Sequence, residues 1–167
     1  MANINTVKTM NQINSCLKEL VVTTAFLNLG RYIQHGDTSC LWHSIAVAYY
    51  SLMIVRLLHI PCNRHSLLIG ALFHDYFLYD WHDKDTSHRL HGFRHPKTAL
   101  KNTRKIRKIN QIEIDIISKH MFPLTPIPPV YRESIIVCII DKFCSLYEVF
   151  CRNTYKAIKS RCIITVE

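Results

Sequence analysis

Glycine is scarce in this chain, with only 4 residues among 167, and four of the 6 prolines lie between residues 123 and 129. Residues that interrupt regular structure are therefore rare elsewhere, so the sequence predicts long unbroken elements and favours helices over strands. Internal repeats, low-complexity tracts and linkers are also absent. A chain of this length without such divisions predicts one domain over residues 1–167.

Cysteine pairs at the spacing of a zinc knuckle or a redox motif are missing as well. The seven cysteines are odd in number, and no two of them form a CxxC pair. Cys138 and Cys144 fall within an apolar run, where cysteine behaves as a small hydrophobe. We therefore expect seven reduced thiols and no disulfide framework. The N-terminus also lacks the pattern of a signal peptide, so the sequence predicts a cytoplasmic protein.

Acidic residues are outnumbered, with 12 Asp and Glu against 21 Lys and Arg, which gives a net charge of +9. This balance favours an anionic ligand such as a phosphate ester, a nucleotide or nucleic acid, although a basic surface that only aids solubility gives the same charge. One apolar stretch, residues 41–58, approaches the length of a membrane span. Because it contains His43 and Arg56, we interpret it as a core helix and expect no membrane partner.

The helical spacing of apolar residues predicts an all-α protein of about seven helices. The expected helices cover residues 4–34 with a break near Gly30, 40–58 after a capping turn at 36–39, 63–77, a fourth from about Pro96, 111–120 and 129–147, before a short amphipathic segment. Asn110 and Glu113 form a capping box for the fifth helix, and Pro96 suits the first turn of the fourth. Residues 78–94 fit no period and predict a functional loop, while 123–129 predict a rigid connector.

Two carboxylates and a histidine fall where the helical pattern predicts burial. Asp141 follows six continuous apolar positions, and the pair His74-Asp75 follows the run Leu-Leu-Ile-Gly-Ala-Leu-Phe. An unpaired buried carboxylate is very costly, so each must be paired or bind a cation. A single buried aspartate more often tethers two helices than binds a metal, and a lone buried histidine is more often a satisfied core residue.

The set as a whole favours a metal site, because further histidines occur near or within predicted helices. The candidate ligands are His43, His74, Asp75, His95, His120 and Asp141. Imidazole and carboxylate groups together suit iron, manganese, zinc or cobalt, and do not suit a closed structural zinc site built from cysteine. The sequence thus predicts a metal-site core over about residues 40–147.

The order His, His-Asp, His, His, Asp resembles the HD-domain superfamily of metal-dependent phosphohydrolases. The likeness covers residues 43 to 141 and rests on the words WHSIAVA, GALFHD, RHPKTA, SKHM and IIDK around the six candidates. It is similar in spacing to the HD hydrolases that split dinucleoside tetraphosphates and to small HD proteins of Gram-positive anaerobes. Many relatives carry Gly or Lys shortly after the His-Asp pair, where this chain continues Tyr76-Phe77, so a lysine role there is not transferred.

The resemblance implies an HD helical bundle that hydrolyses a phosphoester or phosphoanhydride with metal-activated water. It implies that His43, His74, Asp75 and Asp141 hold one divalent transition metal and that Asp75 bridges where there are two. His95 and His120 match the additional ligands of two-metal relatives. The expected substrate is a phosphorylated small molecule such as a nucleotide or dinucleotide, acted on by a monomer or a homodimer.

Basic residues near these ligands are candidates for contacts with a substrate phosphate. Arg94 and Lys119 flank two ligands and are expected, with Asp75, to take part in catalysis. The expected substrate-binding residues are Lys97, Arg89, His91 and His35, with His88 also in the loop. Lys97 begins a basic stripe with Lys101, Arg104, Lys105 and Lys108, which has the spacing of a solvated helix face as well as of a nucleic-acid surface.

Two other functions remain open at this point. Some HD proteins share this ligand set but hold two irons and oxidise their substrate with oxygen. A small HD protein could also act as a non-catalytic nucleotide sensor, although the presence of all six candidate ligands counts against a degenerate site. The ligand pattern alone does not distinguish these alternatives from hydrolysis.

Overall fold

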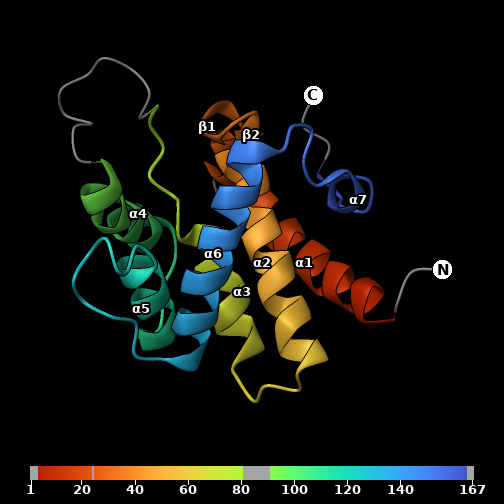
Figure 1. The fold of residues 1–167 in the computed structure, drawn as a ribbon, viewed down its shortest axis with the longest axis horizontal. Coiled ribbons are helices and arrows are strands. Elements are labelled where there is room, and N and C mark those ends of the chain that lie inside the picture. The colour runs from red at the N-terminus through yellow and green to blue at the C-terminus, as the bar shows by residue number, and fades with distance from the viewer. Residues whose placement is uncertain (1–3, 24, 81–90, 165–167) are drawn as a thin grey trace.

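The computed structural model describes residues 4–23, 25–80 and 91–164, and this part of the chain forms a bundle of helices (Figure 1). Its elements are α1 (Ile4–Thr23), the 3-10 helix η1 (Ala25–Arg31), β1 (Ile33–His35), β2 (Thr38–Ser39), α2 (Cys40–Leu57), α3 (Arg64–Phe73), α4 (His91–Ile106), α5 (Gln111–Lys119), α6 (Arg132–Phe150) and α7 (Lys156–Lys159). The prediction of an all-α protein is confirmed. Strands within the described residues are limited to the antiparallel pair β1 and β2.

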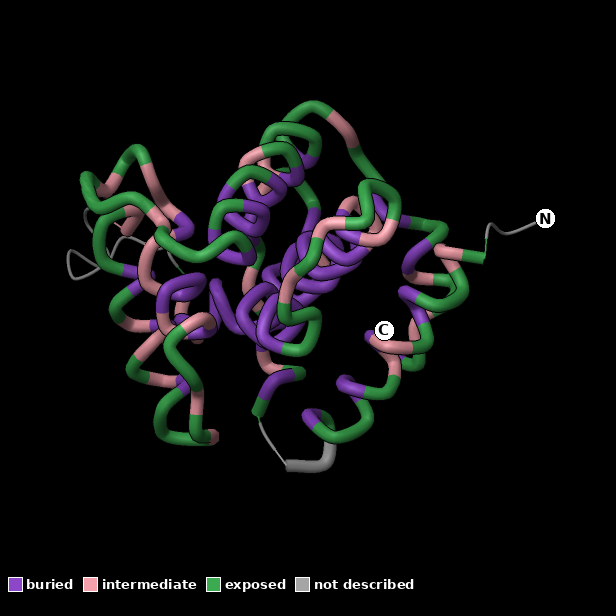
Figure 2. Tube along the Cα trace, turned by 90° about the horizontal axis from the view of Figure 1, so that it is seen from below, coloured by how far each residue is buried: buried purple, intermediate pink, exposed green. Residues whose placement is uncertain are grey.

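Helix α2 is the centre of the bundle, with α1, α3, α6 and η1 packed against it. Its residues 43–49 are all buried, and the buried residues gather along the central helices in Figure 2. A helix that is apolar on all sides is typical of one surrounded by protein. Among the described helices, α2 alone is long and apolar enough to cross a membrane, and 61% of it is buried inside the fold.

The N-terminal region differs from the prediction of one helical segment broken near Gly30. Helix α1 already ends at Thr23, and the following 3-10 helix gives way to a short hairpin instead of continuing to residue 34. Gly36, at the hairpin turn, has a φ of 59°, and a Cβ there would collide with the backbone oxygen of Glu148. Only glycine allows this conformation and this close approach to α6 at little cost. Ser39 caps α2 as expected, because its side chain accepts from the N–H of Trp42.

Three other boundaries also differ from their predicted positions. Helix α3 ends at Phe73, so His74 and Asp75 lie in the turn that follows it. Helix α4 begins at His91, within the stretch expected to be a loop, and Pro96 therefore lies in its second turn instead of its first. At this position the proline removes the hydrogen bond to the carbonyl of Gly92 and its ring crowds that carbonyl, yet the helix continues through it to Ile106. Helix α6 begins and ends three residues later than expected.

Helix α5 is fixed against α3 at both of its ends. Its predicted capping box, formed by Asn110 and Glu113, is present, and Asn110 also donates a hydrogen bond to the hydroxyl of Ser66 on α3 at 2.8 Å. Farther along, Gly70 of α3 faces Ile116 of α5 so closely that a Cβ on Gly70 would lie 2.8 Å from the Cβ of Ile116. The missing side chain of Gly70 thus sets the distance between the two helices.

Candidate metal centre

His43 projects from the central helix α2 and is completely buried. Its Nδ1 donates to the carboxylate of Glu148, with both oxygens at 2.9 Å. Its Nε2 faces the opposite way and lies 3.0 Å from Oδ1 of Asp141. Both acidic residues stand on α6, one on each side of the imidazole ring. The ring is therefore held between two carboxylates in the interior.

His74 completes one half of the site. Its Nδ1 donates to the backbone oxygen of Ala71 at 2.8 Å, so its Nε2 is free to face the centre. That Nε2 lies 3.3 Å from Nε2 of His43, 3.3 Å from Oδ2 of Asp75 and 3.5 Å from Oδ1 of Asp141. We call His43, His74, Asp141 and Oδ2 of Asp75 the inner half-site.

His95 and His120 form a second pair, which comes from α4 and the end of α5. Their Nδ1 atoms donate to the backbone oxygens of His91 and Ile117, at 3.1 and 3.0 Å. Their Nε2 atoms lie 2.7 Å apart, and they are 3.2 and 3.5 Å from Oδ1 of Asp75. We call this pair with Oδ1 of Asp75 the outer half-site.

Asp75 lies between the two half-sites and is 1% exposed. Its Oδ2 accepts a hydrogen bond from Nε2 of Gln34 at 2.6 Å and faces the inner half-site. Its Oδ1 is buried and has no hydrogen-bond partner. Both outer histidines direct Nδ1 toward a backbone oxygen, so in the neutral tautomer that donates there Nε2 faces Oδ1 as an acceptor.

This arrangement fits a metal ion at each half-site. Four imidazoles use Nδ1 as a donor to a fixed acceptor and direct Nε2 toward one carboxylate, which is the way proteins orient histidine ligands. The ligand atoms of His43, His74 and Asp75 lie within 4.8 Å of one another, and so do those of Asp75, His95 and His120. A cation would also give Asp75 Oδ1 the partner that it lacks. The donor set of nitrogen and carboxylate oxygen suits transition metals.

The electrostatic effects at the two half-sites are different. Burial alone would lower the pKa of His43, but Glu148 and Asp141 raise it well above its ordinary value. The same opposition at His74, with Asp75 as the main charge, raises its pKa to about 9. Burial, reinforced by His95, instead lowers the pKa of His120 to about 4. The neighbouring His74 overcomes burial at Asp75 and holds the pKa of that carboxyl well below its usual range.

A cavity of about 880 Å³ opens onto the centre from one side. Asp75, His95, His120 and Asp141 contribute to its wall, whereas His43 and His74 are fully buried behind them. The outer half-site therefore faces the space that a substrate would enter. This volume lies within the range of ordinary small-molecule sites.

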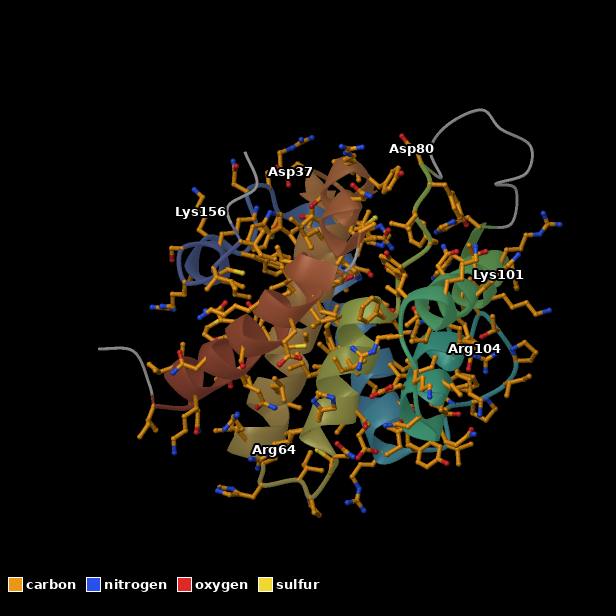
Figure 3. All side chains as sticks on the ribbon, turned by 180° about the vertical axis from the view of Figure 1, so that it is seen from behind. Asp37, Arg64, Asp80, Lys101, Arg104 and Lys156 are labelled. Carbon is orange, nitrogen blue, oxygen red and sulfur yellow. The ribbon has the colours of Figure 1, made fainter. Side chains whose placement is uncertain are left out.

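The structure brings all six candidate ligands together, and His35 and His91 line the cavity as a substrate contact would. Lys119 instead forms an ion pair with Asp115 at 2.5 Å. Arg94 and Lys97 are exposed on α4, and Figure 3 shows Lys101 and Arg104 of the basic stripe on the outer side of the same helix. Arg89 and His88 lie outside the described residues. The cavity wall is thus made from residues other than the exposed stripe.

Four further residues at the centre did not emerge from the sequence. They are Gln34, Lys142, Glu148 and Tyr155. Lys142 lines the cavity and donates to the backbone oxygen of His120 at 2.6 Å. Its position directly after Asp141 was a signal that could have identified it. Glu148 follows Asp141 by two helical turns, so the helical period could have placed it on the same face.

The fold and the ligand geometry together define a protein with an HD-type metal centre. The model of the HD domain family matches residues 41–146, well over half of the chain, so the chain belongs to that family. The resemblance noted in the sequence is thereby confirmed. Searches of the curated proteins and of the solved structures found no match. The matched segment begins after Gln34 and ends before Glu148 and Tyr155.

Proposed function

We propose that this protein is a metal-dependent phosphohydrolase that cleaves a phosphoester or phosphoanhydride of a nucleotide or dinucleotide. The observation that carries the proposal is the position of Asp75, whose two oxygens face two separate pairs of imidazole nitrogens. A carboxylate in that position can bridge two ions, and paired ions are typical of enzymes that act on phosphate esters. Membership of the HD family supports the same chemistry.

The residues that would hold the ions follow from the two half-sites. The inner one offers His43, His74, Asp75 and Asp141, and the outer one offers Asp75, His95 and His120. The donors suit divalent Fe, Mn, Zn or Co. When bound, such ions lower the pKa of a water molecule from about 15.7 toward 7 and stabilise charge on phosphoryl oxygens.

The chain itself would bind and orient the substrate in the cavity. Lys142 brings a positive charge to the cavity wall, and His35 and His91 add hydrogen-bonding groups there. A lysine ammonium is a point charge well suited to a phosphate oxygen. The cavity of about 880 Å³ is large enough for a nucleotide. We therefore assign the phosphate contact expected from Lys119 to Lys142, because Lys142 lines the cavity whereas Lys119 pairs with Asp115 outside its lining.

The test is a metal analysis of the purified full chain, followed by a phosphate-release screen over nucleotides and dinucleoside polyphosphates with Mn, Fe, Zn and Co. We expect about two equivalents of metal and release of phosphate, or of a nucleotide product, from at least one substrate. Asp75→Asn is the matched control, because it keeps the size of the side chain but weakens the bridge. Activity that persists in Asp75→Asn would contradict the proposal.

The same preparation distinguishes the oxygenase alternative. Oxygen uptake would be measured with the iron-loaded protein and each candidate phosphorylated compound. Uptake coupled to substrate loss, without any hydrolysis product, would replace the proposed reaction with oxidation. Hydrolysis at the same rate without oxygen would support it, because water is then the only co-substrate required.

A further inference from the structure

The four imidazoles of the centre differ in the group that accepts a hydrogen bond from their Nδ1. Three of them, those of His74, His95 and His120, donate to neutral backbone oxygens. His43 alone donates to a carboxylate, that of Glu148, whose side chain is 0% exposed. A carboxylate behind an imidazole ligand raises its basicity and its attraction for a metal ion. This effect acts on the inner half-site only.

Glu148 is itself fixed by Tyr155. The phenol of Tyr155 donates to Oε1 of Glu148 at 2.7 Å, and its side chain is buried. Burial raises the pKa of this phenol, so it keeps the proton that it donates. Tyr155 lies just before α7 with a φ of 63°, where the chain turns back against the bundle after α6. A residue beyond the HD-matched segment therefore orients the carboxylate behind His43.

The two half-sites also differ in charge and in access. The inner one contacts the carboxylates of Asp141, Glu148 and Asp75, whereas the nearest carboxylate oxygen to the outer one is Oδ1 of Asp75, with Asp141 within 4.8 Å of His120. The inner histidines are fully buried, and the outer ones line the cavity. Greater negative charge and less contact with solvent both favour retention of a cation.

We propose that the two half-sites bind their ions unequally: the inner half-site retains its ion, the outer half-site exchanges its ion through the cavity, and Glu148 with Tyr155 is the positioning pair that creates the difference. This inference rests on the proposed function only in assuming that metal binds at both half-sites. It assigns to the chain's C-terminal segment a role in metal retention, which the HD-matched residues alone do not contain.

The experiment titrates metal-stripped full-length protein with Mn²⁺ by calorimetry, with metal content after dialysis as a second measurement. The wild type should show two binding steps of different affinity and keep about one ion after dialysis. Glu148→Gln preserves an acceptor for His43 but removes the charge, and it should weaken the tight step roughly 10- to 100-fold while leaving the weak step unchanged. Tyr155→Phe should weaken the same step by a smaller factor.

Glu133→Gln is the matched control, because Glu133 is another buried glutamate on α6 that instead accepts a hydrogen bond from the backbone of Asn63. It should leave both steps unchanged. Two equal steps in the wild type, or equal weakening of both steps in Glu148→Gln, would overturn the inference. Unequal binding without any hydrolysis would leave the inference standing and refute the proposed function. Hydrolysis by a protein that binds both ions equally would support the proposed function and refute the inference.

Discussion

The Nε2 atoms of His95 and His120 lie 2.7 Å apart, although both rings use Nδ1 to donate to a backbone oxygen. In the neutral form of the rings two lone pairs face each other at this distance, next to the buried Oδ1 of Asp75. A proton or a cation between the two Nε2 atoms removes the repulsion between their lone pairs. The pair is therefore the most direct indication that the outer half-site holds an ion.

Replacing one member of this pair should remove one ion. We expect His120→Ala to lower the bound metal from about two equivalents to about one and to reduce turnover strongly, because the proposed chemistry would use two ions to stabilise the attacking and leaving oxygens. Metal analysis and single-wavelength anomalous scattering from manganese-grown crystals would measure the loss. A variant that still binds two ions would show that His120 is not a ligand.

Removal of the bridge should abolish activity without unfolding the chain. Asp75→Asn should retain less than about 1% of wild-type turnover, since in the proposed reaction water would be activated by ions that this carboxylate would help to hold. The helical content should persist, because a domain of this size folds by burying its apolar core. Circular dichroism and metal content would separate the two effects. Wholesale loss of helix would identify the centre as structural.

Metal binding should release protons near neutral pH. The pKa of His74 is raised to about 9 and that of His43 is raised well above its ordinary value, so both shifts favour the protonated form of these rings in the metal-free protein. An incoming ion must displace those protons, so its affinity should rise as the pH rises from about 6 to 9. Calorimetry in buffers with different ionisation enthalpies would count the protons. Affinity that is independent of pH in this range would contradict the prediction.

Lys142 and Lys101 should differ in their effect on catalysis. Lys142 lines the cavity, whereas Lys101 is exposed on the outer side of α4. Lys142→Met keeps the length of the side chain but removes the charge, and we expect it to lower kcat/KM about 10- to 100-fold, the cost of one charge-assisted hydrogen bond. Lys101→Met should have little effect. Metal content must stay unchanged in both, since Lys142 also contacts the backbone of His120.

The meeting of the six candidate ligands in the interior could be expected because buried charge is visible in a sequence. Asp141 and the His74-Asp75 pair interrupt long apolar runs, and only a partner or a cation makes that tolerable. The all-α fold class could be predicted for a similar reason, because the helical spacing of apolar residues and the scarcity of glycine both favour helices over strands. These features are local, and local features can be seen in one sequence.

The contacts around the ligands are long-range and could not be predicted in the same way. Glu148 meets His43 across 105 positions, and Gln34 meets Asp75 across 41, so only the packing of α6 and the hairpin against the core reveals them. The predicted start of α4 was wrong because Pro96 was placed in the first turn, whereas the helix begins at His91 and runs through the proline. The ion pair of Lys119 with Asp115 has the i, i+4 spacing of a helix pair, so this contact is local and could have been predicted from the sequence.

Gly70→Ala should destabilise the protein although it lies apart from the metal ligands. The added Cβ would lie 2.8 Å from the Cβ of Ile116, so α5 must move away from α3. Overpacking of this kind costs about 1–3 kcal/mol, which chemical denaturation would measure. Ile116→Ala in the same chain should recover part of the loss, because the two side chains share one space. If Gly70→Ala lowers the free energy of unfolding equally in the presence of Ile116 and in the Ile116→Ala variant, the contact with Ile116 is not the cause of the destabilisation.

The contact between Gly70 and Ile116 has a consequence for the evolution of the two metal half-sites. His74 and Asp75 follow α3 and His120 follows α5, so the gap between those helices would determine how far apart ions bound at the two half-sites would lie. A descendant of this chain can thus change the spacing of the two half-sites, and the size of ion that they accept, by exchanging side-chain volume between positions 70 and 116. Every ligand would stay unchanged. A lineage that changed its metal would carry the record of that change in its helix packing.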